Sequence, residues 1–422
     1  MKSSVKANSN FDIYRQTSCR YCDAALPVSF LNLGTMALAN SFIGSDQKVS
    51  QEFTCPLDLT WCGYCKLVQL SHVVPPEKMF SNYLYVSSTT KTFQEHFLKY
   101  AQTVKAKLGA KNNMLAVDIG SNDGLLLSCY QKSGMRAVGV EPAKNLSDSA
   151  NRMGLPTINR FFDSSCIQEI IDRYGKADVV SANNVFAHIH DVKAVCRNVY
   201  DLLSEQGLFV IEFPYLVTMF EEMFFDMIYH EHLSYISITP LNYFMTSQGF
   251  KIVAIEKVAS HGGSLRVFSA KQSSQRKVST EVGDFLKGEA EKGYLTSSVY
   301  KEFAKRVKNV KITLNQFVSS VQFEGKTISG YGAPAKANTI INYCGFKPSD
   351  IEYIVDDNPL KQNTLSPGAH IPIVPSQYLF DRPTDYVLIF AWNFASEIMK
   401  KIDHLKTRGI KFIIPLPKPT II

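Results

Sequence analysis

The sequence predicts an α/β protein of three parts: a small N-terminal module, a central domain on a mostly parallel sheet, and a second α/β domain at the C-terminus. Three observations carry this prediction. Two Cys-x-x-Cys pairs lie near the N-terminus, strands and helices alternate from residue 114 onward, and a second alternation begins near residue 326. A charged helical connector precedes the second alternation. We place the three parts at residues 1–80, 81–275 and 276–422.

The composition is that of a globular protein, with 45% hydrophobic and 20% charged side chains among 422 residues. The net charge of +7 suits a substrate that carries phosphates, but it does not by itself indicate nucleic acid. The first residues contain no apolar core, and no stretch approaches about 20 apolar residues, so we expect neither a secretory signal nor a membrane span. We expect a cytoplasmic protein whose nine cysteines are thiols or metal ligands.

The N-terminal module carries Cys19-Arg-Tyr-Cys22 and Cys62-Gly-Tyr-Cys65. Each pair forms a tight turn that directs two sulfurs at one point, so together they supply four thiolates to one tetrahedral zinc ion. A closed set of four sulfurs predicts a structural zinc. Cys55 is a rival ligand, but it precedes a proline and has no partner at this spacing. The alternative is a group of unpaired buried thiols.

The stretch 114–134 predicts a buried strand, a glycine loop and a helix whose first amides point into the loop. Its Gly-x-x-x-Gly spacing departs from the NAD fingerprint, and acids at Asp118 and Asp123 suit a sulfonium cation better than a pyrophosphate. Glu141 ends the next strand, where an acid bonds the hydroxyls of a ribose. The pattern resembles the S-adenosylmethionine loop of class I methyltransferases; the alternative is a turn without ligand. The expected cofactor-binding residues are Asp118, Gly120, Ser121, Asn122, Gly124, Glu141, Asn183 and Asn184.

Further strands follow the loop. They are expected within residues 136–142, 156–162, 176–191, 202–215, 251–258 and 262–271. Seven strands that end in a hairpin form the plan of the class I methyltransferases, a Rossmann-like fold. Ligands of such a sheet lie at the carboxyl ends of its strands, where Asn183, Asn184 and His188 are expected.

An insertion at residues 215–240 contains Tyr229-His230-Glu231-His232. Four hydrogen-bonding side chains in a row, flanked by aromatics, are costly to bury without a role. A satisfied polar cluster and a metal site are the alternatives. We predict catalysis, because the insertion follows the fifth strand and therefore overhangs the cofactor edge.

The C-terminal region repeats the strand, glycine loop and helix pattern at residues 326–345. Its run from Gly330 to Ala335 resembles a dinucleotide fingerprint with alanine in the third place, and Lys336 stands just inside the helix. The amides and the lysine suit a pyrophosphate, whether of NAD or of a nucleotide sugar.

Together these motifs resemble the S-adenosylmethionine-dependent C-methyltransferases of nucleotide-linked deoxysugars. The resemblance rests on the Cys-x-x-Cys pairs and on the runs DIGSNDG, NNVFAHIHD, YHEHLSY, HGGSLRVF, GYGAPAKAN and Trp392-Asn393. It implies a zinc module, a class I methyltransferase domain and a C-terminal Rossmann-like domain that holds the sugar nucleotide. It also implies methylation at carbon 3 of a dTDP- or GDP-linked 4-keto-6-deoxyhexose, for a surface polysaccharide such as lipopolysaccharide or for a secondary metabolite. We expect a monomer that binds neither nucleic acid nor membrane.

The resemblance also implies roles for individual residues. Around the sugar it places Tyr83, His188, Tyr229, Glu231 and His232. We assign His232 as the base that removes the proton beside the ketone, because histidine titrates near neutral pH, while Tyr and His donors stabilise the resulting enolate. The other expected substrate-binding residues are His230, Gly332, Ala333, Lys336, Asn338, Trp392 and Asn393.

Two alternatives remain open from the sequence. An NAD-dependent nucleotide-sugar oxidoreductase would act through the C-terminal glycine loop, but it leaves the loop at 117–124 unexplained. A zinc-containing RNA methyltransferase or RNA binder would need a basic stripe interleaved with aromatics beside the cysteine pairs. Residues 19–72 contain few lysines or arginines.

Overall fold

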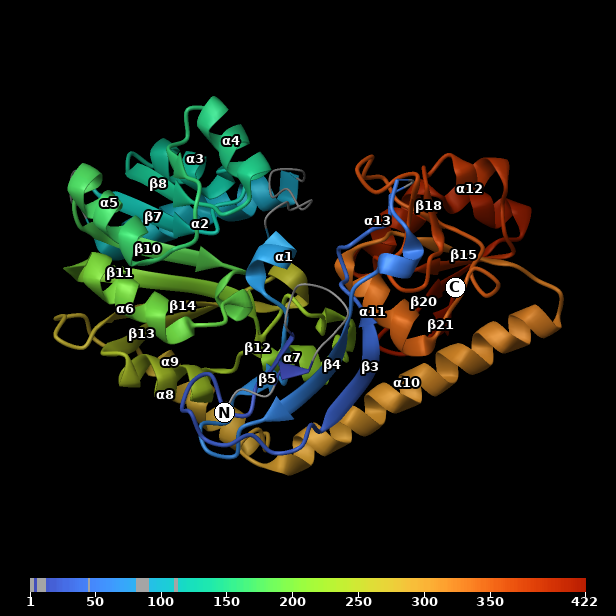
Figure 1. Ribbon diagram of the computed structural model, residues 1–422, viewed down its shortest axis with the longest axis horizontal. Helices are drawn as coiled ribbons and strands as arrows, with labels where there is room; N and C mark the ends of the chain where they lie inside the picture. Colours follow the sequence, from blue (N-terminus) through green and yellow to red (C-terminus); the bar gives the residue numbers. More distant parts are fainter. Residues whose placement is uncertain (1–3, 6–12, 45, 81–90, 110–112) are drawn as a thin grey trace.

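The computed structural model describes residues 4–5, 13–44, 46–80, 91–109 and 113–422. Two α/β domains lie on opposite sides of the molecule, with the strands of the N-terminal module between them (Figure 1). The long helix α10 (Ser297–Phe323) runs beneath all three parts and joins the central domain to the C-terminal domain (Figure 1). No helix within the described ranges is long and apolar enough to cross a membrane.

The N-terminal module is built on a four-stranded sheet of order β12-β5-β4-β3. Three of its strands belong to the module: β3 (Leu31–Ala37), β4 (Thr54–Trp61) and β5 (Val68–Leu70). The fourth, β12 (Ser234–Tyr235), comes from the central insertion and pairs antiparallel with β5. The sequence did not indicate this pairing, which anchors the insertion to the module. The remaining elements are β1 (Ser4–Val5), β2 (Ile13–Arg15), η1 (Val49–Gln51), β6 (His72–Val73) and α1 (Pro76–Phe80).

The central domain has a seven-stranded sheet of order β13-β14-β11-β10-β7-β8-β9. Its strands are β7 (Leu115–Ile119), β8 (Arg136–Val140), β9 (Thr157–Ile158), β10 (Ala177–Asn183), β11 (Leu203–Pro214), β13 (Phe250–Val258) and β14 (Ser264–Lys271). Strands β7 to β11 pair in parallel, whereas β14 runs antiparallel to both β11 and β13. This topology confirms the predicted class I fold. The third strand is shorter than the predicted 156–162, because only Thr157 and Ile158 pair with β8 at this sheet edge.

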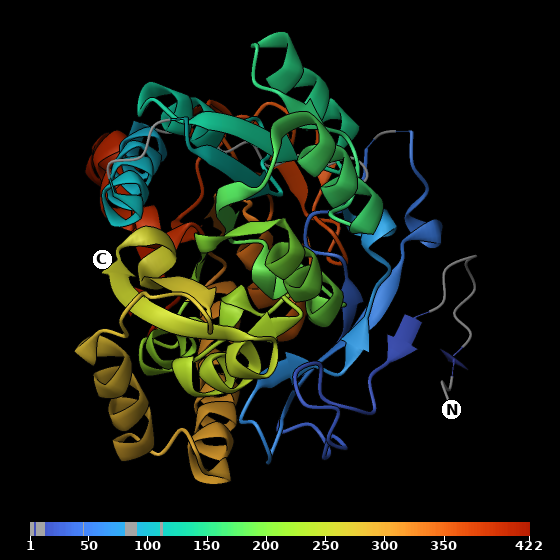
Figure 2. The ribbon, with the colours of Figure 1, turned by 90° about the vertical axis from the view of Figure 1, so that its left-hand side faces the viewer.

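Helices cover both faces of this sheet (Figure 2). They are α2 (Lys91–Leu108), α3 (Leu125–Lys132), α4 (Lys144–Arg152), α5 (Ser164–Tyr174), α6 (Val192–Leu202), α7 (Leu216–Glu221) and α8 (Ile238–Ser247). The 3₁₀ turns η3 (Phe186–His188) and η5 (Ser260–Gly262) follow strands, whereas η4 (Phe225–Met227) follows α7. Side chains of α2 and α3 form one core with one face of the sheet. The core on the other face continues into the N-terminal module and the C-terminal domain, so the three parts share it.

The C-terminal domain repeats the α/β arrangement on a sheet of order β17-β18-β16-β15-β19-β20-β21. Its strands are β15 (Ile328–Tyr331), β16 (Ile354–Val355), β17 (Thr364–Leu365), β18 (Pro372–Val374), β19 (Tyr386–Ile389), β20 (Lys411–Ile414) and β21 (Thr420–Ile421). Its helices and turns, with the connector, are α9 (Thr280–Glu291), α10, α11 (Ala335–Cys344), α12 (Tyr378–Asp381), η6 (Trp392–Phe394), α13 (Ala395–Lys401) and η7 (Asp403–Arg408). The five inner strands are parallel, which confirms the predicted second Rossmann-like domain.

Candidate active site

The glycine loop of the central domain joins β7 to α3. Gly120 has a φ of +64°, and a Cβ built there would lie 2.6 Å from a methyl carbon of Val185. Only glycine meets both the conformation and the contact without strain. The loop therefore turns tightly at the carboxyl edge of the sheet and packs closely against Val185.

Glu141 fixes the shape of this loop. One carboxylate oxygen accepts a hydrogen bond from the Asn122 amide at 2.8 Å, and the other accepts one from the Ala143 amide at 2.8 Å. The side chain is 6% exposed, and burial raises its pKa. Besides any contact with a ribose, Glu141 thus holds the loop backbone.

Asp118 lies beneath the loop, within a buried polar group. Its Oδ1 accepts hydrogen bonds from the Ser181 hydroxyl at 2.6 Å and from the Asn183 amide nitrogen at 3.4 Å. Burial raises the pKa of Asp118 to about 7, and the charge of Glu141 adds to this shift. The buried amide oxygens of Asn183 and Asn184 have no hydrogen-bond partner among the described residues. Orphaned acceptors beside a glycine loop fit a ligand that brings hydrogen-bond donors, as the amine and ribose of S-adenosylmethionine do.

Three of the predicted catalytic side chains meet beyond this edge. The imidazole of His232 lies 5.0 Å from that of His188 and 4.0 Å from the ring of Tyr229, between ring centroids. His188 comes from η3 after β10, and the ring of Phe80 in α1 stacks on it with 5.8 Å between centroids. The insertion and the β10 edge therefore converge at these three rings. Tyr83 lies outside the described residues.

The orientation of His232 is set by the backbone. Its Nδ1 lies 2.7 Å from the carbonyl oxygen of Met227. A carbonyl oxygen only accepts, so Nδ1 carries the hydrogen and Nε2 holds the lone pair of the neutral ring. This is the tautomer that a base acting through Nε2 requires.

Glu231 faces a cavity of about 700 Å³. Its Oε1 accepts a hydrogen bond from the Asn40 side chain at 2.6 Å, and both residues line the cavity. The other walls come from the N-terminal module, within residues 38–53 and 78–79, and include Lys48 and Lys78. The sequence did not point to Asn40 or to this wall, because Asn40 and Glu231 are separated by 191 positions.

His230 departs from its predicted place at the substrate. It is 2% exposed, and its Nε2 donates a hydrogen bond to the Cys55 carbonyl at 3.0 Å. Burial lowers the pKa of His230 to about 4, so the ring is neutral. Successive side chains of the segment point to different sides, and His230 packs into the N-terminal module.

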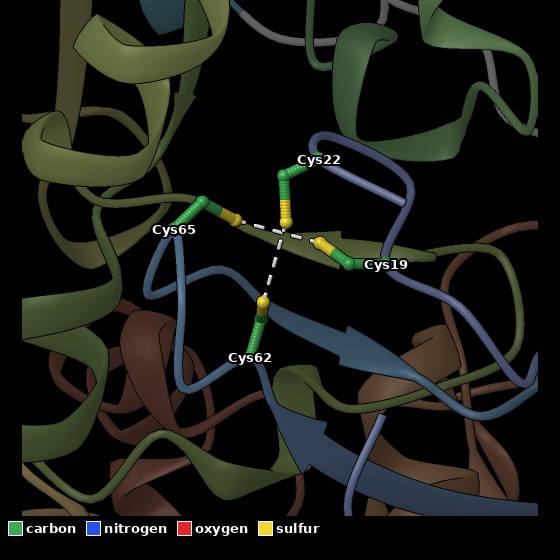
Figure 3. A group of neighbouring side chains, drawn as sticks. All are labelled: Cys19, Cys22, Cys62 and Cys65. Carbon is green, nitrogen blue, oxygen red and sulfur yellow. Dashed lines mark hydrogen bonds between the residues drawn. The ribbon is translucent and has the colours of Figure 1, made fainter. Parts of the chain in front are cut away.

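The four predicted cysteines lie together between two turns of the N-terminal module (Figure 3). The Sγ atoms of Cys19 and Cys65 are 3.4 Å apart, those of Cys22 and Cys62 are 3.5 Å apart, and all four lie within 4.8 Å of one another. Sulfurs about 2.3 Å from a tetrahedral zinc would be about 3.8 Å apart, so the cluster fits the ion. In the described part of the chain, no other group of three or more candidate ligands comes together. Cys55 is buried elsewhere, with its Sγ 3.6 Å from the Pro56 carbonyl.

The C-terminal glycine loop has its amides already engaged, which corrects the prediction that they bind a diphosphate. The Gly332 amide donates to the Val355 carbonyl at 2.7 Å, and the Ala333 amide donates to the Asp356 carboxylate at 2.6 Å. A Cβ at Gly332 would lie 2.6 Å from that of Ala391, so its glycine serves close packing. The negative charge of Asp356 also disfavours a diphosphate at this place.

The other predicted ligands from this domain contact protein groups. Lys336 is buried; its ammonium donates to the Asn393 side chain at 2.6 Å and lies 3.8 Å from the Trp392 ring centroid. Asn338 donates to the Ala39 carbonyl at 2.6 Å. None of the side chains Lys336, Asn338, Trp392 and Asn393 lines the 700 Å³ cavity. They belong instead to the contact between domains.

The sequence prediction missed Asp226, a fully buried acid of η4. Its Oδ2 accepts a hydrogen bond from the Trp392 indole at 2.6 Å. The available signal was a single acid inside the aromatic run Phe224-Phe225-Asp226-Met227. A carboxylate in such a run is costly to bury unless it has a partner.

Sequence similarity to known proteins extends over nearly the whole chain. Three family models match: "Putative zinc binding domain" at residues 19–80, "Methyltransferase domain" at 93–255 and "C-methyltransferase C-terminal domain" at 259–417. The C-methyltransferase NovU of Streptomyces niveus is 35% identical over 404 residues, which cover 96% of each chain.

Similar solved structures cover only part of the chain. Magnesium protoporphyrin IX methyltransferase of Synechocystis PCC 6803 has 14% identity and a TM-score of 0.33 over 42% of this chain and 79% of its own. A Thermotoga maritima protein, described as a possible histamine N-methyltransferase, has 15% identity and a TM-score of 0.32 over 42% of this chain and 89% of its own.

Proposed function

Since the chain belongs to the family of S-adenosylmethionine-dependent C-methyltransferases with a zinc-binding module, we propose that it methylates carbon 3 of a nucleotide-linked 4-keto-6-deoxyhexose. One observation carries the proposal. The Met227 carbonyl holds His232 in the tautomer whose Nε2 accepts a proton, within a group that also contains His188 and Tyr229. A base flanked by hydrogen-bond donors suits a reaction that forms an enolate.

The chemistry accounts for each side chain in that group. A saturated sugar carbon becomes nucleophilic only after it loses a proton, and the neighbouring ketone makes that proton acidic. The Nε2 atom of His232 takes the proton, and the electron pair moves toward the ketone oxygen. His188 or Tyr229 donates a hydrogen bond to the negative charge that develops there. S-adenosylmethionine, when bound, supplies the electrophilic methyl group.

The cavity beside Glu231 is the proposed site of the nucleotide sugar. Its volume of about 700 Å³ falls in the range of small-molecule sites. Lys48 and Lys78 are the basic side chains of a lining that also carries Asp46, Glu52 and Glu231, and we assign the diphosphate to the two lysines. The hydrogen bond from Asn40 orients the Glu231 carboxylate, and Glu231 directly precedes His232 in the chain. This assignment replaces the diphosphate site expected at the C-terminal glycine loop.

The remaining functional residues hold the cofactor and the fold. We assign the ribose of S-adenosylmethionine to Glu141 and the amine to the neighbourhood of Asp118 and Asn183, where charge and orphaned acceptors are present. The four cysteines form a closed set, so their zinc has a structural role.

Proton exchange tests the base directly. The protein is incubated in deuterated water with a dTDP- or GDP-linked 4-keto-6-deoxy sugar and S-adenosylhomocysteine, and deuterium at carbon 3 is measured by mass spectrometry. We expect exchange in the wild type, and a loss of about 100- to 10,000-fold in His232→Asn while both ligands still bind. His190→Asn, on an exposed residue near His188, serves as the control.

The His188→Asn variant decides between the two histidines. Normal exchange by His232→Asn together with loss of exchange by His188→Asn would assign the base to His188. Absence of exchange and of methyl transfer with every 4-keto sugar, in protein that binds S-adenosylmethionine, would overturn the proposed substrate.

A further inference from the structure

We propose that Asp226 is a positioning residue through which the C-terminal domain sets the catalytic tautomer of His232. The inference rests on the proposed function, because it takes His232 to be the base. The structural path has three steps: Trp392 holds the Asp226 carboxylate, Asp226 holds η4, and the Met227 carbonyl of η4 receives the hydrogen of His232 Nδ1.

The first step is a directional contact between domains. Asp226 is 0% exposed, and its Oδ2 accepts the Trp392 indole hydrogen at 2.6 Å across 166 positions of sequence. Its Oδ1 has no hydrogen-bond partner among the described residues. The Trp392 ring also packs against Phe224 at 4.7 Å between centroids. Because the indole nitrogen is a donor only, this contact defines both the distance and the direction of η4 relative to the C-terminal domain.

Charge strengthens the same contact. The Lys336 ammonium lies 3.8 Å from the Trp392 ring centroid and is held there by Asn393. Burial raises the pKa of Asp226 to about 6 and lowers that of Lys336 to about 8, and the charge of each group opposes the shift of the other. The buried charges of Asp226 and Lys336 therefore stabilise one another, and the Trp392 indole contacts both groups.

The second and third steps lie within one turn of chain. Asp226 and Met227 are neighbours in η4, and the Met227 carbonyl lies 2.7 Å from His232 Nδ1. The next carbonyl, that of Ile228, accepts a hydrogen bond from Thr339 of α11 at 2.9 Å. The C-terminal domain thus contacts both chain neighbours of Met227, Asp226 and Ile228. A rotated η4 would turn the Met227 carbonyl away and release the ring to its other tautomer, which places a hydrogen on Nε2.

The Trp392→Phe variant tests this path, since it keeps an aromatic ring and removes the donor. We expect kcat for methyl transfer to fall at least about tenfold, with the KM for S-adenosylmethionine unchanged, because tautomer control limits the base and not the cofactor site. NMR of isotope-labelled histidine distinguishes the tautomers, and comparison with His232→Asn assigns the signal. We expect the Nδ1-protonated signal of His232 to become an average of both tautomers. The control is Phe394→Leu, in the same turn η6 but 49% exposed.

Asp226→Asn is the conservative substitution at this position, because the asparagine side chain keeps an oxygen that accepts the indole hydrogen. We expect it to retain more activity than Asp226→Ala. A wild-type kcat and an unchanged His232 signal in Trp392→Phe would overturn the inference. Failure of the proposed base is a different result: His232→Asn would then exchange the carbon 3 proton normally, whatever the effect of Trp392→Phe.

Discussion

Replacing Glu141 with alanine should weaken S-adenosylmethionine binding by about 1–3 kcal/mol, whereas replacing Asp356 with alanine should leave it unchanged. The two acids are structural counterparts. Each follows the second strand of its domain and accepts a hydrogen bond from the glycine loop, Glu141 from the Asn122 amide at 2.8 Å and Asp356 from the Ala333 amide at 2.6 Å. Comparison of the two variants therefore shows which of the two glycine loops binds the cofactor.

The magnitude follows from the contacts of Glu141. Alanine removes the acceptor for both the Asn122 and Ala143 amides, together with the proposed contact to the ribose. Leaving one such buried group unpaired costs about 1–3 kcal/mol, and water enters poorly at a side chain that is 6% exposed. If S-adenosylmethionine binds the variant with one of these hydrogen bonds missing, its dissociation constant rises about 5- to 150-fold.

Isothermal titration calorimetry of both variants with S-adenosylmethionine gives the comparison. Thermal unfolding of the free proteins is the control for folding, since both substitutions remove buried hydrogen bonds. Equal weakening in the two variants, or weakening only in Asp356→Ala, would refute the assignment of the cofactor to the central loop. Tight binding of NADH without heat from S-adenosylmethionine would refute it as well.

Three further predictions concern the metal, the pH dependence and the cavity. Elemental analysis should find one zinc per chain in the wild type and in Cys55→Ser, but not in Cys62→Ser; retention of zinc by the last variant would contradict the cluster. Because burial raises the pKa of Asp118 to about 7, its carboxylate ionises as pH rises from 6 to 8. The affinity for S-adenosylmethionine, a sulfonium cation, should therefore rise from pH 6 to pH 8 relative to the affinity for S-adenosylhomocysteine, whose sulfur is uncharged. The same pH dependence in Asp118→Asn would show that Asp118 is not the cause. Asn40→Ala should raise the KM for the nucleotide sugar more than that for S-adenosylmethionine, and equal effects would place the sugar elsewhere.

The parts of the fold that the sequence predicted depend on local patterns. The class I domain could be predicted because β7, β8 and β10 are short apolar runs at regular spacing, and each is followed by a helical segment. The four cysteines were readable because each pair forms its own turn. In both cases a few neighbouring residues determine the local geometry, and the order of elements along the chain does the rest.

The parts that the sequence did not reveal depend on contacts between distant residues. The hydrogen bond from Asn40 to Glu231 joins residues 191 positions apart, and the pairing of β12 with β5 joins the central insertion to the N-terminal module. Nothing in the local pattern of either segment specifies its partner. His230 shows the same limit, because the adjacent residues that we predict to be catalytic gave no sign that its ring faces the Cys55 carbonyl.

The C-terminal glycine loop shows how a local fingerprint and its use can diverge. Other residues of the protein already bind the backbone of this loop. Asp356 accepts a hydrogen bond from the Ala333 amide, and Lys361 donates one to the Ala333 carbonyl at 2.9 Å. The Lys361 ammonium also lies 5.3 Å from the Phe42 ring centroid. Ile43 forms a backbone bridge with Leu365 beside it. The segment at Phe42 and Ile43 of the N-terminal module therefore packs against the C-terminal domain near its glycine loop. Since the same segment lines the proposed substrate cavity, we propose that the C-terminal domain supports one wall of that cavity.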